Sequence, residues 1–217
     1  MIAVFVVSLG VLSGLTVSLL GAQAKLGYWS VLVQAVAYAL MLLAMKVIFF
    51  WRQQPLFRSL AWHKTVFGIS SLAAIGFSLF LLSVILQLVL RTPEISTPFE
   101  KMLRSDLASR LAITLFGITL GPLIEELLFR GFLQPVLVNV AGVFPGILIT
   151  AAIFGGMHLA QNAGLWQSGV IITLAGFGFG MVRHITGSTQ ASTIAHIAYN
   201  TLPFLATTLD NSHSTPK

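Results

Sequence analysis

The sequence has no cysteine and few charged residues. Among its 217 residues, Asp, Glu, Lys and Arg together make up 8%, against about 25% in an average soluble domain. The lack of cysteine excludes disulfides, thiol nucleophiles and thiolate metal ligands. The low content of charged residues, together with 56% hydrophobic residues, excludes an ordinary soluble domain. We therefore predict a polytopic, all-α bundle of transmembrane helices.

The hydrophobic residues gather in runs of about 20, long enough to cross a hydrocarbon core of about 30 Å, and they predict about seven spans. The approximate spans are residues 2–22, 29–50, 66–90, 111–137, 146–160, 165–182 and 188–209. The first run ends in a small-x-small pattern typical of a cleaved signal peptide. It has no basic residues before it and is too long, so we expect it to be retained.

The charged residues lie mostly between the hydrophobic runs. Twelve Lys and Arg against six Asp and Glu give a net charge of +6. Basic residues in such positions face phospholipid headgroups, so we expect membrane lipids as partners and no nucleic acid. They are divided almost evenly between the two predicted sides of the membrane, so the positive-inside rule does not decide the orientation.

A separate helix is predicted between the third and fourth runs. Thr97, Pro98 and Glu100 form a capping box with proline at the first helical position. Hydrophobic and basic residues then recur at helical spacing, which favours an amphipathic helix along the membrane interface over a solvated loop. Its apolar face comprises Phe99, Met102, Leu103 and Leu107, and its polar face comprises Lys101, Arg104 and Arg110.

Three charged residues lie inside the fourth run, where a charge costs about 2.5 to 3.5 kcal/mol. Glu126 and Arg130 are four residues apart, so they share a helix face and can neutralise each other. Glu125 lies about 100° round the helix and needs another partner. Just before them, Gly121 and Pro122 are expected to kink the helix and open room for water.

Polar side chains also interrupt two later runs. His158 ends the fifth run, while His196 and Asn200, four residues apart, share one face of the seventh. A packed histidine or a lone ion pair would explain each feature separately. Together with the three charged residues, they can converge only inside the bundle, because lipid would penalise each one. We therefore expect one polar site among the C-terminal helices.

The residue types limit the chemistry of this site. The sequence has no His-Glu-x-x-His zinc motif and no Gly-x-Ser-Gly nucleophile motif. Its only aspartates, Asp106 and Asp210, lie at the ends of predicted spans, which argues against an aspartyl dyad. A water activated by Glu and His remains, with or without a metal.

Three short motifs resemble those of the CAAX protease and bacteriocin-processing family, CPBP. Residues 125–130, Glu-Glu-Leu-Leu-Phe-Arg, are similar to its Glu-Glu-x-x-x-Arg motif. Residues 154–158 resemble its Phe-x-x-x-His motif, and residues 196–200 its His-x-x-x-Asn motif. The motifs follow the family's order on separate predicted helices, so the resemblance covers about residues 121–200.

This resemblance implies an intramembrane endopeptidase of the type II prenyl-protease kind. Glu125 would be the general base, and His158 would polarise or share the attacking water. His196 and Asn200 would donate hydrogen bonds to the oxyanion. Glu126 and Arg130 would be the supporting pair.

Zinc is an alternative in this scheme. Glu125, His158 and His196 would supply oxygen and nitrogen ligands for a catalytic tetrahedral site, and the family is often labelled metalloprotease. Asn200, which follows His196 by four residues, is an atypical zinc ligand. We favour water activation without a metal.

The predicted spans and the resemblance together divide the chain. Residues 1–110 would form N-terminal transmembrane helices and the interfacial helix, residues 111–209 the catalytic helical core, and residues 210–217 a free tail. The expected substrate is a peptide or membrane protein, lipid-modified or not, and the expected location is a prokaryotic cell membrane, spanned several times.

Two other functions use the same residues. A non-catalytic membrane partner, such as a bacteriocin-immunity or regulatory protein, would use them to shape a binding cavity. An ion or proton pathway would use them as a relay, but no inverted repeat supports that function.

Overall fold

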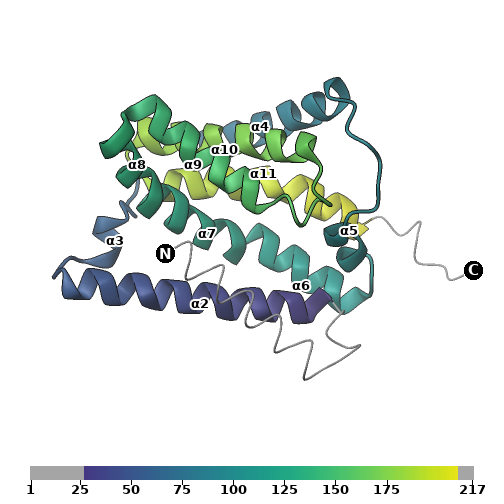
Figure 1. The fold of residues 1–217 in the computed structure, drawn as a ribbon, viewed down its shortest axis with the longest axis horizontal. Helices are drawn as coiled ribbons and strands as arrows, with labels where there is room; N and C mark the ends of the chain where they lie inside the picture. Colours follow the sequence, from purple (N-terminus) through teal and green to yellow (C-terminus); the bar gives the residue numbers. More distant parts are fainter. Residues whose placement is uncertain (1–26, 210–217) are drawn as a thin grey trace, which may run out of the picture.

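The structure is a computed structural model that describes residues 27–209, and over these residues it contains helices and no strands. The predicted first span and the predicted tail lie outside the described residues. The helices are α2 (Gly27–Trp51), α3 (Leu56–Ser59), α4 (Ile69–Val89), α5 (Pro98–Leu103), α6 (Leu107–Ile118), α7 (Leu120–Glu126), the π-helix η2 (Leu127–Leu133), α8 (Gln134–Ala141), α9 (Val143–Met157), α10 (Trp166–Thr186) and α11 (Thr189–Leu209). The long helices run side by side, with α3 at one end of the molecule and α5 at the other (Figure 1). The fold is an all-α membrane helical bundle.

Four helical segments are long and apolar enough to cross a membrane: Tyr28–Trp51, Ile69–Val89, Leu107–Ala141 and Trp166–Thr186. The structure therefore does not confirm the expected number of about seven spans. The shorter α9 is apolar over 15 residues. The remaining long helix, α11, has 21 residues but many polar ones.

Helix α11 lies at the centre of the bundle. It packs against α4, α6, α7 and α10, and most of its first three turns are buried. Its side chains therefore meet protein instead of lipid, so this helix can carry the polar residues of a site. The contact with α4 is close, because a Cβ added to Gly76 would overlap the carbonyl oxygen of Ala195. Small residues at helix contacts allow such an approach in membrane proteins.

The interfacial helix begins as predicted and ends early. The side chain of Thr97 caps α5 by accepting a hydrogen bond from the Glu100 N–H at 3.1 Å. After six residues, Asp106 starts a new helix by accepting from an N–H of its first turn at 2.8 Å. Leu107 and Arg110 therefore belong to α6, and the prediction of one amphipathic helix that includes them is wrong.

The expected break near the glutamates lies slightly before its predicted position. Thr119, with φ −130° and ψ −88°, separates α6 from α7. Pro122 follows in the first turn of α7, where a missing N–H is tolerated. After Glu126 the chain continues as η2, a π-helix that the sequence did not predict. Short π-helical segments are frequent at functional sites.

Candidate active site

One cavity of about 370 Å³ opens among the helices that carry the predicted site. Helices α2, α5, α6, α7, α10 and α11 line it, together with the end of α9. Its size falls in the range of small-ligand pockets. All four predicted catalytic residues line this cavity: Glu125, His158, His196 and Asn200. The sequence prediction that these side chains converge is therefore confirmed.

Glu125 receives a partner that the sequence did not indicate. The hydroxyl of Tyr38, on α2, donates a hydrogen bond to Oε1 of Glu125 at 2.7 Å. The other carboxylate oxygen, Oε2, lies 3.9 Å from Nε2 of His196. The Glu125 side chain is 17% exposed, so the carboxylate is held at one oxygen and still reachable from the cavity.

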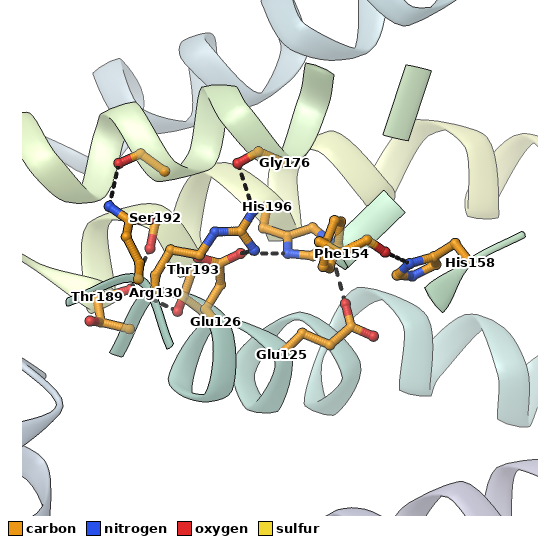
Figure 2. Close-up of polar contacts among 12 residues, drawn as sticks. Glu125, Glu126, Arg130, Phe154, His158, Gly176, Thr189, Ser192, Thr193 and His196 are labelled. Atoms are coloured by element: carbon orange, nitrogen blue, oxygen red, sulfur yellow. Dashed lines mark hydrogen bonds and ion pairs between the residues drawn. The ribbon is translucent and has the colours of Figure 1, made fainter. Parts of the chain in front are cut away.

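Glu126 and Arg130 form the predicted ion pair behind the cavity wall. Nη1 of Arg130 donates to Oε1 of Glu126 at 2.7 Å, and neither side chain is exposed. Nη2 donates to the carbonyl oxygen of Gly176 at 2.7 Å, as Figure 2 shows. The guanidinium carbon also lies 4.7 Å from the centre of the Phe154 ring. These contacts join η2 to α10 and offset the buried charge, while Nε of Arg130 and Oε2 of Glu126 have no hydrogen-bond partner among the described residues.

His196 lies between the two glutamates (Figure 2). Its Nδ1 is 3.0 Å from Oε1 of Glu126, the oxygen that also accepts from Arg130. An ionised carboxylate only accepts hydrogen bonds, so Nδ1 carries a proton and Nε2 is the atom that faces Glu125. The imidazole stacks on Phe179, with 4.4 Å between ring centres and 19° between planes. The ring orientation is therefore fixed on two sides.

His158 approaches the cavity from the end of α9. Its Nδ1 lies 2.8 Å from the carbonyl oxygen of Phe154. A carbonyl oxygen also only accepts, so Nδ1 is the donor and the neutral ring keeps the lone pair on Nε2. The side chain of Asn162 donates to the His158 carbonyl oxygen at 2.9 Å and steadies the turn that follows.

Asn200 shares a face of α11 with His196, as its spacing predicted. Its Nδ2 donates to the carbonyl oxygen of Gly117 at 2.8 Å. That contact uses one N–H of the amide, so the second can serve a ligand in the cavity. The bond also ties α11 to α6.

The possible donors are not assembled as a zinc site in this arrangement. Among the described residues, no group of three or more His, Asp and Glu side chains is placed to hold a metal. A catalytic zinc site needs three protein ligands at about 2.0 to 2.2 Å. Both histidines use Nδ1 in other contacts, with Glu126 and with Phe154, and these contacts leave Nε2 of each ring available to a ligand. Zinc at Glu125, His158 and His196 stays a prediction, and no step below depends on it.

Sequence analysis missed three residues of the site. Tyr38 donates a hydrogen bond to Glu125. Phe179 stacks on His196, and Asn162 donates to the carbonyl oxygen of His158. A tyrosine or phenylalanine in a hydrophobic run has no distinctive pattern, and its partner lies in a distant part of the sequence. Only Asn162 carried a signal, because it follows His158 by four residues.

One comparison with known proteins matches the part of the chain that carries this site. Residues 107–202 match the family model described as Type II CAAX prenyl endopeptidase Rce1-like. No curated protein and no solved structure matches the chain. The matched segment contains both glutamates, Arg130, both cavity histidines and Asn200, so the C-terminal part of the chain is similar to this family. The resemblance drawn from the three motifs is confirmed. The chain is thus a membrane helical bundle whose residues 107–202 are similar to a protease family.

Proposed function

We propose that this protein is an intramembrane endopeptidase that hydrolyses peptide bonds in membrane-associated peptides or proteins. The observation that carries the proposal is the common cavity of Glu125, His158, His196 and Asn200, which lies within the segment that matches the protease family. Most of the cavity lining is apolar, which suits a hydrophobic substrate segment, lipid-modified or not. We place the protein in a prokaryotic cell membrane.

The reaction begins with a water molecule between Glu125 and His158. Glu125 takes a proton from this water through the carboxylate oxygen that faces the cavity, and the lone pair on Nε2 of His158 accepts a hydrogen bond from it. The water oxygen attacks the scissile carbonyl carbon and forms a tetrahedral oxyanion. Glu125 then returns the proton to the amine as the C–N bond breaks, which releases a carboxylic acid and an amine.

The oxyanion needs donors that are already in place. Asn200 offers its second amide N–H. His196 offers Nε2 in its doubly protonated form, because Nδ1 already faces Glu126. In that form the site has no net charge. The two negative carboxylates, of Glu125 and Glu126, are balanced by the guanidinium of Arg130 and the imidazolium of His196. Burial within a membrane favours such a balance.

The test is cleavage of a peptide panel followed by mass spectrometry. Purified protein, its Glu125→Gln variant and a Glu94→Gln control are incubated with prenylated C-terminal peptides and membrane-spanning peptides. Glu94 is exposed and does not line the cavity, so its variant should cleave like the wild type. Glu125→Gln keeps the side-chain shape, removes the base and should lower turnover by about 100-fold to 10,000-fold.

The same panel decides the alternatives. A chelator should leave the rate unchanged, and loss of activity that zinc restores would favour the metal-dependent mechanism. Cleavage that persists in Glu125→Gln would refute the proposed base. A wild-type protein that cleaves no peptide would count against the peptidase and favour a binding role, such as bacteriocin immunity.

A further inference from the structure

Helix α2 brings a hydroxyl group to Glu125 from outside the segment that matches the protease family. This helix packs along α6, and Tyr38 lies on the face turned toward α6 and α7. The tyrosine is 3% exposed. Its ring stacks on Phe116 with 5.8 Å between centres and 17° between planes. The hydroxyl therefore has a fixed place beside the Glu125 carboxylate.

The hydrogen bond gives the two oxygens of Glu125 different surroundings. Oε1 accepts from the Tyr38 hydroxyl at 2.7 Å, whereas Oε2 lies 3.9 Å from Nε2 of His196. A glutamate side chain rotates about several bonds, so an unheld carboxylate would populate several rotamers. A donor bonded to a charged oxygen is among the stronger fixed contacts in a protein.

We propose that Tyr38 is a positioning residue for the general base. Its hydroxyl holds Oε1 of Glu125, and Oε2 is then the oxygen presented to the attacking water. Tyr38 does not line the cavity, so it acts through Glu125 and does not touch the substrate. This inference rests on the proposed role of Glu125, and it assigns the N-terminal helices a part in the machinery of the C-terminal half.

The environment of Glu125 defines what the test must separate. The titratable and charged groups near this carboxylate are Tyr38 from α2, Glu126 from α7, Arg130 from η2, His158 from the end of α9 and His196 from α11. Only the first donates directly to Glu125 at hydrogen-bond distance in the described part of the chain. Removing that hydroxyl therefore takes its donor from Glu125, along with a hydrogen bond to Gln34, and leaves the other charges in place.

The variant Tyr38→Phe keeps the ring and its stack on Phe116. With a peptide that the wild type cleaves, we expect kcat to fall about 10-fold to 100-fold, the factor of a hydrogen bond to a charged group. KM should stay within about twofold, because the substrate does not contact Tyr38.

Tyr28→Phe is the matched control, because Tyr28 lies on the same helix and does not line the cavity. Its kcat and KM should equal those of the wild type. If Tyr38 only fills space, the kcat per folded protein will stay unchanged in Tyr38→Phe, and the inference falls. The peptidase proposal would survive that result, because Glu125→Gln tests it separately.

An infrared measurement tests Tyr38 without a substrate. The antisymmetric carboxylate stretch of Glu125 is identified by its loss in Glu125→Gln. In Tyr38→Phe this band should change its frequency, because Oε1 loses the hydrogen bond from the tyrosine hydroxyl. An unchanged band would overturn the inference, even if no cleaved peptide were found and the peptidase proposal had failed.

Discussion

Glu126 and Arg130 form an ion pair of 2.7 Å in which neither side chain is exposed. The same carboxylate oxygen lies 3.0 Å from Nδ1 of His196, and Arg130 also donates to the carbonyl oxygen of Gly176. The pair therefore connects η2, α10 and α11 through one buried network. Such a pair contributes little net stability over a hydrophobic replacement, but breaking it leaves one buried charge without its partner.

The first prediction follows from that asymmetry. Arg130→Met preserves much of the side-chain volume and takes the guanidinium away from Glu126, which keeps its contact with His196, so it should cost about 3 to 5 kcal/mol. In a thermal unfolding experiment in detergent, we expect a Tm lower by about 10 °C. The double variant Glu126→Gln with Arg130→Met removes both charges and should recover most of the loss. An equally low Tm in the double variant would show that packing, and not the unpaired carboxylate, accounts for the effect.

Asp106 gives a prediction about acid stability. Its carboxylate accepts from the Ser109 hydroxyl at 2.5 Å and from the Ser109 N–H at 2.8 Å. Both bonds lower the pKa of Asp106 from its ordinary value of 3.8, and the bond from the hydroxyl has the larger effect. The folded state binds a proton less readily than the unfolded state. The stabilisation is therefore fully present above about pH 4 and is lost as the pH falls through the lower folded-state pKa.

The matched variant for this residue is Asp106→Asn. Asparagine also caps a helix well but does not titrate in this range. Between about pH 5 and pH 2, the Tm of the wild type should fall more steeply than that of Asp106→Asn. Parallel curves for the two proteins would contradict the assignment of Asp106 as a titrating cap.

The polar site was predictable because its residues interrupt hydrophobic runs. The pairing of Glu126 with Arg130 and the common face of His196 and Asn200 follow from helical spacing alone. The bond from Tyr38 to Glu125 spans 87 positions of the sequence, so no local pattern indicates it. Tertiary packing alone brings these two side chains together.

The helix limits show where hydropathy fails. Helix α11 is surrounded by other helices and can therefore carry many polar residues. Its hydropathy is then too low to identify it as a membrane span, whereas the hydropathy of α2 and α4 identifies both. The π-helix η2 has no sequence signal, because the same residues suit an α-helix. The early end of α5 did have a sequence signal, because Asp106 followed by Ser109 is a capping pattern that competes with a continuous helix.

The last prediction uses two neighbouring glycines of α9. A Cβ on Gly155 would overlap Thr173 and lie 2.7 Å from the carbonyl oxygen of Gly169, whereas a Cβ on Gly156 has no neighbour within 4 Å. Gly155→Ala should therefore push α10 away and displace His158, with a lower Tm and a lower rate of cleavage. Gly156→Ala adds the same methyl group and gains about 1 kcal/mol of helix propensity, so its Tm should equal or exceed that of the wild type. Similar losses in both variants would mean that α9 and α10 do not meet at Gly155, and the position of His158 would then need another support.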